Sequence, residues 1–419
     1  MSLYPAFRVQ YLASCIQYPK HQLITMISVE EAKAIIEKEI TPLTPVKKNL
    51  QEAAGKLLAE DIYAAIDIPA FPQSSMDGYA FSFDAWKENN KLVVNGVIAA
   101  GHDKDIPLKR GDAVRIFTGA AVPSGADTVV MQEKTKIING VLIIEDESLN
   151  AGTNVRPMGS EIRAGERALS KLSFLSPAAI GFLAGLGIKE VTVYPTPSVS
   201  IIVTGNELQE PGNPLQYGQV YESNSFALSA ALRQLGINEI EIIHADDKLE
   251  ELTAVLNSCL QKTDLVLLTG GVSVGDYDFV LQAANNCGVK QLFHKVKQRP
   301  GKPLYLGKKE EKVVFGLPGN PSSVLSCFYQ YVITAIGKMS NQRVALEIKR
   351  VPLSNSFKKA SGLTHFLKGY YDGDSVTLLN AQESYRLSSF ARANCLVQIN
   401  EEVTAYPVGE LVEIHLLPV

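Results

Sequence analysis

Between residues 195 and 337 the sequence alternates strand-like apolar runs with amphipathic helix-like runs, and this alternation limits the fold more than any other feature. Strand-like runs such as SVSIIVTG and DLVLLTGG are followed by helix-like runs such as SFALSAALRQLG and DFVLQAANNCG. Strands that alternate with helices form a mostly parallel sheet with helices on both faces. The segment therefore predicts a three-layer α/β domain, and ligands of such domains bind outside the carboxyl ends of the strands.

The segments on either side of this domain predict smaller structures. Residues 71–164 consist of short strand-like runs between glycine and proline turns, which is typical of a small β-domain. Ser28 and Glu31 form a capping box ahead of an amphipathic helix, and a second helix is expected at residues 48–59. The last part of the chain alternates apolar and polar residues between turns, which predicts a C-terminal β-barrel.

We therefore expect a multidomain fold, α/β plus β, because a chain of 419 residues is long enough for two to four domains. The expected parts are residues 1–25, a poorly structured extension; residues 26–70 and 165–195, one discontinuous N-terminal domain; residues 71–164, a β-domain inserted into it; residues 196–340, the α/β domain; and residues 341–419, the β-barrel.

The composition excludes several classes of protein. With 46% hydrophobic and 20% charged residues, the chain has enough apolar material for folded cores and is not disordered. A net charge of -4 argues against a nucleic-acid partner, and no apolar run approaches the ~20 residues of a membrane span. The five cysteines show no CxxC spacing, so we expect neither a zinc site nor a disulfide framework, and we predict a cytoplasmic location.

Polar, glycine-rich or charged turns follow five of the predicted strands. Any one of them alone would be an ordinary solvated loop. Because the carboxyl ends of parallel strands meet at one edge of a sheet, we expect the five turns to converge on one ligand site. The residues in question are Thr204, Gly205 and Glu207; Asp247; Thr269, Gly270, Gly271, Ser273 and Gly275; Arg299, Pro300, Gly301 and Lys302; and Pro318, Gly319, Asn320, Pro321, Ser322 and Ser323.

Two features of these turns suit a ligand that contains phosphate. Gly270, Gly271 and Gly275 allow backbone N–H groups to approach an anion at the start of a helix. The run HKVKQRPGK supplies cations, and alternate residues of a strand share one face. The cations on that face are Lys295, Lys297 and Arg299. The chain contains neither GxxxxGK[ST] nor GxGxxG, so the glycine turn matches no common nucleotide-binding signature.

Carboxylates at the same strand ends need a separate explanation. Glu207, Asp247 and Asp278 each follow a different predicted strand, so they can converge in space. Carboxylate oxygens beside phosphates are how proteins hold Mg²⁺, whereas isolated acids at loop tips are usually solvated. A Ser/His/Asp hydrolase is excluded, because the chain has no GxSxG and no histidine placed as a general base.

Seven motifs in order give the chain a resemblance to a known family. They are SSMDGYA at 74–80, FTGAAVPSGADTVVMQE at 117–133, NVRPMGSEI at 154–162, TGNEL at 204–208, TGGVSVGDYDF at 269–279, RPGKP at 299–303 and GLPGNPSS at 316–323. In these motifs the chain resembles the molybdopterin molybdenumtransferases, which are related to the C-terminal domain of gephyrin. The resemblance covers residues 26–419, nearly the whole chain.

The resemblance implies a reaction and an assembly. Adenylylated molybdopterin and molybdate, the metal donor, would give molybdenum cofactor and AMP with the help of Mg²⁺. The family fold has four domains, and members are elongated homodimers with an active site in a cleft between subunits. One side of the cleft would carry Asp77, Thr118, Arg156 and Glu161 of the partner subunit, and the other Glu207, Asp247, Asp278, Lys295 and Arg299.

The same resemblance assigns roles within the cleft. The glycine turns and Lys295, Arg299 and Lys302 would hold the phosphates, and Glu207, Asp247 and Asp278 would hold Mg²⁺. The dithiolene of the substrate, not a cysteine of the protein, would capture the metal. Candidates for binding molybdate are Arg299, Ser323 and the turn at residues 318–322.

The chain departs from the usual family pattern at several positions. Glu161 stands where aspartate is usual, Arg299 where lysine is common, and Cys395 where glycine is usual. Residues 362–369, GLTHFLKG, lack the usual arginine. Two other functions stay open, a molybdopterin adenylyltransferase and a gephyrin-like scaffold that binds a partner peptide, and tungstate remains an alternative to molybdate.

Overall fold

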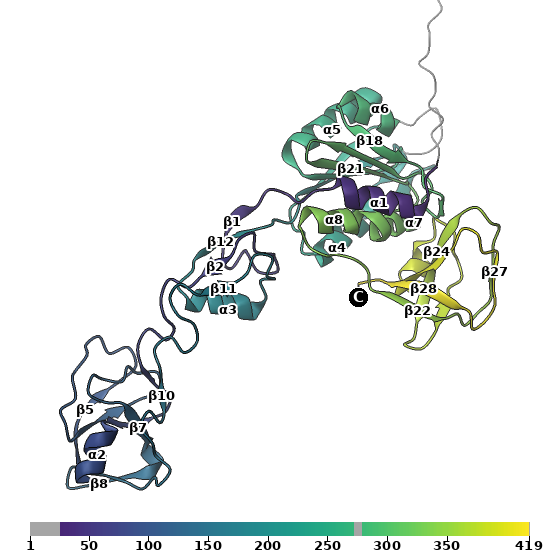
Figure 1. The fold of residues 1–419 in the computed structure, drawn as a ribbon. Coiled ribbons are helices and arrows are strands. Elements are labelled where there is room, and N and C mark those ends of the chain that lie inside the picture. Colours follow the sequence, from purple (N-terminus) through teal and green to yellow (C-terminus); the bar gives the residue numbers. More distant parts are fainter. Residues whose placement is uncertain (1–25, 272–278, 419) are drawn as a thin grey trace, which may run out of the picture. The chain divides into compact units, whose positions relative to one another are not determined.

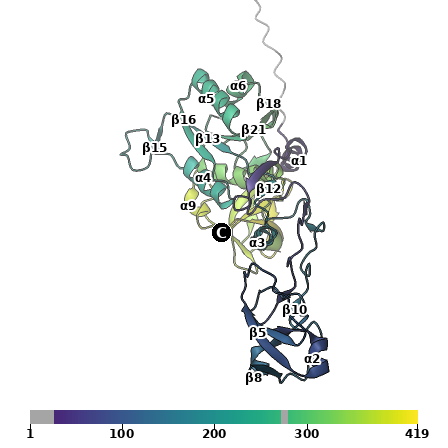
Figure 2. The same ribbon diagram turned by 90° about the vertical axis from the view of Figure 1, so that its left-hand side faces the viewer.

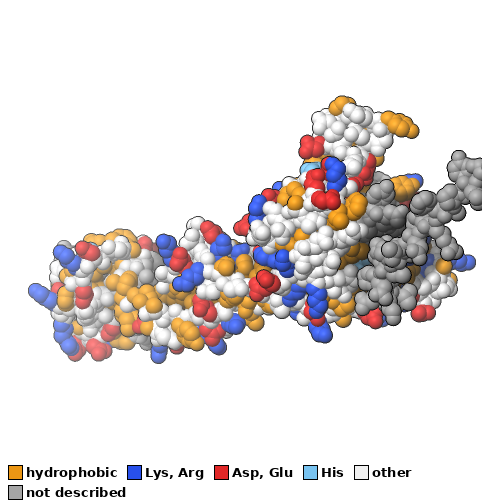
Figure 3. All heavy atoms as spheres, turned by 90° about the horizontal axis from the view of Figure 1, so that it is seen from above, with side chains coloured by type: hydrophobic (Ala, Val, Ile, Leu, Met, Phe, Trp, Pro, Cys, Tyr) orange, Lys and Arg blue, Asp and Glu red, His pale blue; other side chains and the backbone are white. Residues whose placement is uncertain are grey.

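The computed structural model describes residues 26–271 and 279–418, which group into two compact units (Figure 1). One unit contains the chain up to Leu43 together with the chain from Thr196 onward, and the other contains Thr44–Pro195. The finer division into domains that the sequence suggests stays a prediction. On the face seen in Figure 3, basic and acidic side chains are interspersed.

The first unit contains a six-stranded sheet that confirms the expected α/β fold. Its strand order is β16-β13-β17-β21-β20-β18. The first four strands are parallel, and β20 and β18 are antiparallel additions at one edge. The strands are β13 (Val199–Thr204), β16 (Ile240–Ala245), β17 (Leu265–Thr269), β18 (Lys290–His294), β20 (Tyr305–Lys309) and β21 (Lys312–Leu317).

Helices cover both faces of this sheet (Figure 1). The pleat of β13 sends Ile201 into one apolar core and Ile202 into the other, because successive side chains of a strand point to opposite faces. The helices over Ile201 are α1 (Val29–Glu39), α4 (Asn224–Gln234), α7 (Pro321–Cys327) and α8 (Ile333–Met339), and those over Ile202 are α5 (Leu249–Lys262) and α6 (Phe279–Asn286).

Helix α1 begins at the capping box expected from the sequence. The Glu31 amide donates to Ser28 Oγ at 3.0 Å, and the Ser28 amide donates to Glu31 Oε2 at 2.7 Å. Between α7 and α8 the helix widens into one π-helical turn, η2 (Phe328–Val332), so the three segments run on without a break. The arm that carries β14 (Leu208–Gln209) and β15 (Val220–Tyr221) projects from this unit (Figure 2).

The C-terminal part of the first unit is a β-domain, as expected. Its strand order is β19-β24-β26-β28-β22, with β25 also paired to β24, and β23 pairs separately with β27. The first strand, β19, comes from the α/β segment of the chain. The elements are β19 (Gln298–Arg299), β22 (Ile348–Pro352), β23 (Phe357–Lys358), β24 (Thr364–Tyr371), β25 (Val376–Leu378), α9 (Leu387–Phe390), β26 (Cys395–Ile399), β27 (Ala405–Tyr406) and β28 (Leu411–Leu416).

The second unit is built mainly of strands. A six-stranded sheet has the order β7-β4-β6-β5-β9-β8, and three short pairs, β1 with β12, β2 with β11 and β3 with β10, complete the unit. The elements are β1 (Val46–Asn49), β2 (Ile62–Tyr63), β3 (Gln73–Ser74), β4 (Gly78–Phe81), α2 (Phe83–Asn89), β5 (Leu92–Ile98), β6 (Asp112–Ile116), β7 (Thr128–Met131), η1 (Gln132–Lys134), β8 (Thr135–Ile138), β9 (Val141–Ile144), β10 (Val155–Arg156), β11 (Arg167–Leu169), α3 (Pro177–Gly185) and β12 (Glu190–Val193).

The prediction of a helix at residues 48–59 is wrong. The segment starts within β1, which pairs with β12, and continues as turns. Its apolar residues Leu50, Ala53 and Leu58 are buried with spacings that a helix would also give, but Gly55 has φ +76° and interrupts any helix. Pairing with a distant strand therefore outweighs local helix propensity here.

No helix within residues 26–271 and 279–418 is long and apolar enough to cross a membrane.

His294, the last residue of β18, is buried without a hydrogen-bond partner for either ring nitrogen among the residues that the structure describes. Burial, with a smaller contribution from Lys295, lowers the pKa of His294 from 6.5 to about 4. A protonated imidazole at this position would lose its hydration without gaining a partner, so the folded state keeps it neutral.

Because the folded state keeps His294 neutral, we predict that the free energy of unfolding decreases in mild acid. Between pH 6.5 and 4 the unfolded chain binds a proton at His294 that the folded chain does not, so stability falls as the pH falls, by about 2.5 kcal/mol at pH 4.5. We expect His294→Phe to remove about this much of the pH dependence of thermal unfolding. His244→Gln, which alters an exposed histidine of β16, is the control, and an equal effect of both variants would contradict the prediction.

Candidate functional site

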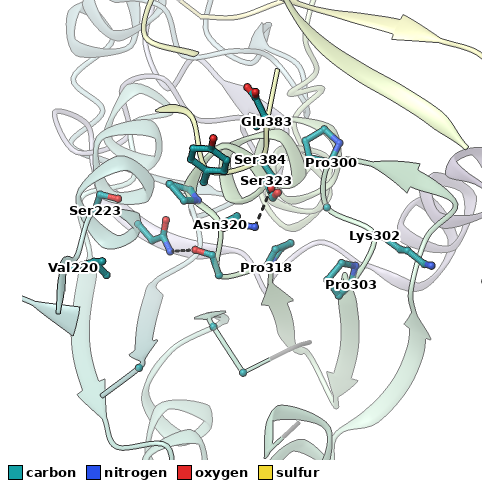
Figure 4. Close-up of a pocket in the computed structure, with 18 of the residues that line it drawn as sticks. Val220, Ser223, Pro300, Lys302, Pro303, Pro318, Asn320, Ser323, Glu383 and Ser384 are labelled. Atoms are coloured by element: carbon teal, nitrogen blue, oxygen red, sulfur yellow. Dashed lines mark hydrogen bonds between the residues drawn. The ribbon is translucent and has the colours of Figure 1, made fainter. Parts of the chain in front are cut away.

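A cavity of about 1150 Å³ lies at the carboxyl ends of the parallel strands of the first unit (Figure 4). Turns that follow β13, β16, β17 and β21 line it, together with the turn after β19 and a segment of the C-terminal β-domain. Its position is the one expected for a ligand site of a parallel sheet. The predicted site residues in its lining are Thr204, Gly205, Glu207, Asp247, Gly270, Gly271, Arg299, Pro300, Gly301, Lys302, Pro318, Gly319, Asn320, Pro321 and Ser323.

Other predicted residues stand elsewhere. Thr269 and Ser322 are buried behind the lining, each with a side-chain hydroxyl that has no partner within the described part of the chain. Lys295 does not line the cavity. Three further predicted site residues lie outside the described residues: Ser273, Gly275 and Asp278.

Gly270 marks a point where two strand ends approach closely. It has φ +90°, and a Cβ there would lie 2.7 Å from the carbonyl oxygen of Thr204 and 2.9 Å from its Oγ1. Thr204 Oγ1 in turn donates to the carbonyl oxygen of Thr269 at 3.3 Å. Only glycine fits this corner, and its backbone therefore borders the cavity directly.

The basic run does not form the single strand expected from the sequence. Strand β18 ends at His294 because Lys295 takes a left-handed conformation with φ +70°. Lys297 then pairs with Glu401 at 3.5 Å. The expectation that Lys295, Lys297 and Arg299 share one strand face is therefore wrong. Arg299 and Lys302 are the cationic residues of this run that line the cavity. We call residues 299–302, which contain both, the cationic turn.

The turn of residues 318–323, which we call the serine turn, is held from both sides. The Ser322 amide donates to the carbonyl oxygen of Ser384 at 3.0 Å, and Asn320 Nδ2 donates to Ser384 Oγ at 2.9 Å (Figure 4). Asn224 Nδ2 donates to the carbonyl oxygen of Gly319 at 2.9 Å. A segment of the C-terminal β-domain thus supports the start of α7, where the backbone can receive an anion.

That supporting segment depends on a buried cation, Lys368 of β24. Its ammonium donates to the carbonyl oxygens of Ala381, Arg386 and Glu383 at 2.8, 3.1 and 3.3 Å. Burial lowers the pKa of Lys368 to about 8. Lys368 therefore fixes residues 382–385, which form one wall of the cavity.

Two carboxylates of the lining are free to meet a cation. Within the described residues Glu207 and Asp247 take part in no ion pair, and no group of three or more metal-ligating side chains is found there. The third acid of the lining near them, Glu222, caps α4 instead: it accepts from the Ser225 amide at 2.8 Å and the Ser225 hydroxyl at 2.6 Å. Mg²⁺ commonly takes one or two carboxylates plus phosphate oxygens, so Glu207 and Asp247 fit it chemically.

The site residues expected on the second unit form a network of their own. The Thr118 amide and hydroxyl both donate to Asp77 Oδ1 at 2.7 Å, and these bonds lower the pKa of Asp77. Gln73 Nε2 donates to the carbonyl oxygen of Gly119 at 3.1 Å, and Arg156 Nη1 donates to Gln73 Oε1 at 3.4 Å. Asp77, Thr118 and Arg156 are thus brought together.

Glu161 is less closely tied to this network. Its amide donates to the carbonyl oxygen of Ile68 at 2.9 Å, but its carboxylate makes no hydrogen bond or ion pair with any described residue.

Comparison with known proteins identifies the family. Residues 27–187 match the MoeA N-terminal region (domain I and II), residues 200–338 a probable molybdopterin binding domain, and residues 350–417 the MoeA C-terminal region (domain IV). A molybdopterin molybdenumtransferase of Haemophilus influenzae is 34% identical over an alignment of 407 residues that covers 94% of this chain and 100% of that protein. The chain belongs to the MoeA family. The family expected from the seven motifs is confirmed.

Other MoeA proteins agree with this assignment. A molybdopterin molybdenumtransferase of Nostoc is 32% identical over an alignment of 422 positions that covers 96% of each chain. Two crystal structures of the molybdopterin biosynthesis MoeA protein of Pyrococcus horikoshii are 29% identical to this chain, with TM-scores of 0.78 and 0.70. Both matches cover 94% of this chain; the first covers 99% of the Pyrococcus chain and the second covers 100%. The MoeA fold therefore extends over nearly all of the chain.

Several residues of this MoeA site could not be chosen from the motifs. Asn224, Ser384 and Lys368 support the cavity, and Gln73 joins Arg156 to the backbone beside Thr118. Two of them carry a weak signal in the sequence. Lys368 interrupts the apolar strand THFLKGYY, and Gln73 stands directly before SSMDGYA. Asn224 and Ser384 carry none, because their role comes from contacts between distant segments.

Proposed function

We propose that this MoeA protein inserts molybdenum from molybdate into adenylylated molybdopterin and releases AMP, giving molybdenum cofactor. The observation that supports this function best is the composition of the cavity in the first unit. Its lining combines cations and glycine-rich backbone with two carboxylates that form no ion pair with any described residue, at the place where a parallel sheet binds ligands. A substrate with phosphates and a divalent counter-ion would satisfy both the cations and the carboxylates of this lining.

The residues of the cavity would divide the work. The backbone of Gly270 and Gly271, with Arg299 and Lys302 of the cationic turn, would hold the phosphates. Arg299 offers a planar fork of donors that matches two oxygens at once. The serine turn, with Ser323 in the lining, is the proposed place for the molybdate oxyanion beside Arg299.

We propose that Glu207 and Asp247, with Asp278 beyond the described residues, hold Mg²⁺ in the presence of the substrate. When bound, the ion would stabilise negative charge on the phosphoanhydride that is cleaved. The contribution of the chain is to hold carboxylate oxygens in the same cavity as the phosphate-binding turns. The proposal gives no chemical role to the four cysteines that the structure describes, because Cys259, Cys287, Cys327 and Cys395 are all buried.

We also propose that the protein acts as a homodimer with an active site shared between subunits. Asp77, Thr118, Arg156 and Glu161 of one subunit would complete the cavity of the other. The network that joins Asp77, Thr118 and Arg156 supports a common role for them. Buried thiols and the composition support a cytoplasmic location.

The decisive measurement is the release of AMP from adenylylated molybdopterin in the presence of Mg²⁺. We expect release that depends on added molybdate and yields a product able to reconstitute a molybdoenzyme. Release of AMP at the same rate without molybdate would contradict the proposal and indicate a hydrolase. Formation of adenylylated molybdopterin from molybdopterin and ATP would indicate the adenylyltransferase instead.

A further inference from the structure

Beneath the cationic turn lies a buried amide, the side chain of Gln298, which is 1% exposed. Its Nε2 donates to the carbonyl oxygens of Pro300 and Gly301, both at 3.1 Å. One side chain thus binds two consecutive carbonyls of the turn that carries Arg299 and Lys302. A bidentate contact of this kind fixes the direction of the turn as well as its position.

The amide is itself held by a buried phenol. The hydroxyl of Tyr331, a residue with no exposed surface, donates to Gln298 Oε1. Tyr331 belongs to the π-helical turn η2, and such turns are frequent at functional sites. The helix that leads into η2 is α7, which begins at the serine turn. Tyr331 and the serine turn are therefore parts of one continuous helix.

Cys327, the last residue of α7, closes the arrangement. Gln298 Nε2 lies 3.5 Å from Cys327 Sγ, and the thiol donates to the carbonyl oxygen of Gly301 at 3.7 Å. Burial raises the pKa of Cys327 to about 12, so the thiol stays protonated and able to donate. Among the described side chains, two polar links therefore join the cationic turn to the helix that starts at the serine turn. One runs through Gln298 to Tyr331, and the other is the direct contact of Cys327 with Gly301.

We propose that Gln298 and Tyr331 are positioning residues. They set the position of the cationic turn relative to the serine turn and so fix the distance between these two anion-binding turns. Tyr331 is outside the cavity lining. Gln298 borders the cavity, but its side chain is buried and its amide is committed to the carbonyls of the turn. The inference rests on the proposed function, because it assigns Gln298 and Tyr331 a role in binding that substrate.

The chemistry explains why a polar pair stands in an apolar core. Without the Tyr331 hydroxyl, the buried Oε1 of Gln298 would have no donor, and an unpaired buried carbonyl is unfavourable. The amide would then gain by turning toward other partners, and the carbonyls of Pro300 and Gly301 would lose their donor. Removal of the Tyr331 hydroxyl oxygen would therefore change the position of Arg299 and Lys302, although it contacts neither of them.

The first test follows the turn itself and needs no substrate. We expect Tyr331→Phe and Gln298→Met to speed hydrogen exchange of the backbone amides in residues 297–304 by roughly three- to tenfold, since the hydrogen bonds that hold the turn are lost. Tyr305→Phe is the matched control. Tyr305 is equally buried, but it belongs to the core on the opposite face of the sheet. Unchanged exchange in Tyr331→Phe and Gln298→Met would overturn the proposal.

The second test asks whether Tyr331 acts through the turn. We expect Tyr331→Phe to weaken binding of adenylylated molybdopterin by roughly three- to tenfold in the natural chain, and by less than about twofold when Arg299 and Lys302 are already alanine. Equal losses in both backgrounds would show a general effect on the fold and overturn the proposal. If the natural chain binds no adenylylated molybdopterin, the proposed function fails, and hydrogen exchange still decides the positioning role.

Discussion

Replacing Asp247 with asparagine or Glu207 with glutamine is expected to slow molybdate-dependent AMP release by on the order of 10²–10³-fold, the cost of losing one group that stabilises developing charge. Both substitutions keep the size and shape of the side chain and remove its charge. Glu207 and Asp247 line the same cavity as the cationic turn and form no ion pair with any described residue, so the loss of either would weaken the proposed Mg²⁺ site.

The neighbouring acid provides a control for this result. Asp246 is exposed, lies outside the cavity lining and pairs with Lys248 at 2.8 Å. We expect Asp246→Asn to change the rate by less than about twofold, as most surface substitutions do. A raised Mg²⁺ concentration should restore part of the rate in Asp247→Asn. Full activity of Asp247→Asn and Glu207→Gln at low Mg²⁺ would contradict their assignment as ligands.

Replacing Gly301 with alanine is expected to destabilise the first unit by about 2–5 kcal/mol and to abolish binding of adenylylated molybdopterin. Gly301 has φ +84°, which costs other residues about 1–2 kcal/mol. A Cβ would also lie 2.4 Å from Cys327 Sγ and 2.9 Å from Gln298 Nε2, and such overpacking adds about 1–3 kcal/mol. The turn would have to move, and Arg299 and Lys302 would move with it.

Two variants separate the clash from the backbone strain. Gly362 has φ +101°, and a Cβ there would meet no atom of the described residues within 4 Å, so Gly362→Ala carries the strain alone. Thermal unfolding of the first unit should therefore shift to a lower temperature in Gly301→Ala than in Gly362→Ala. Cys327→Ala removes the nearest atom, and adding it to Gly301→Ala should recover part of the loss. Equal effects of Gly301→Ala and Gly362→Ala would contradict the role assigned to the close contact.

The parts of the fold that depend on local pattern could be predicted from the sequence. The strand and helix periods between residues 195 and 337 predict the parallel sheet, because its central strands β13 and β17 are buried along their whole length and the helices beside them bury one apolar side. The turns at the strand ends predict most of the cavity lining for a related reason: connectivity alone brings them to one edge. The Ser28 capping box is likewise a local signal.

The parts that depend on distant contacts could not be predicted. Residues 48–59 have a helical spacing of apolar side chains, but pairing of Lys48 and Asn49 with β12 and the left-handed Gly55 prevent a helix. The run around Lys295 has the sequence pattern of a strand, but the left-handed conformation of Lys295 interrupts it, and no residue type in the sequence signals this. Tyr331 lies 33 residues from Gln298, and Ala381 lies 13 residues from Lys368, so no short motif contains both members of either contact.

The pairing of β19 with β24 has a consequence for protein engineering. Gln298 and Arg299 are register partners of Thr364 and His365, and the Thr364 amide donates to the carbonyl oxygen of Lys297 at 3.0 Å. A strand of the C-terminal sheet is therefore also the start of the cationic turn. A chimaera that exchanges the C-terminal domain between MoeA proteins cannot be cut cleanly at the chain connection near residue 345. Gln298 and Arg299 must be exchanged together with the C-terminal domain, because β24 of that domain pairs with them. A graft that leaves them behind would disturb the position of Arg299 and of the cationic turn.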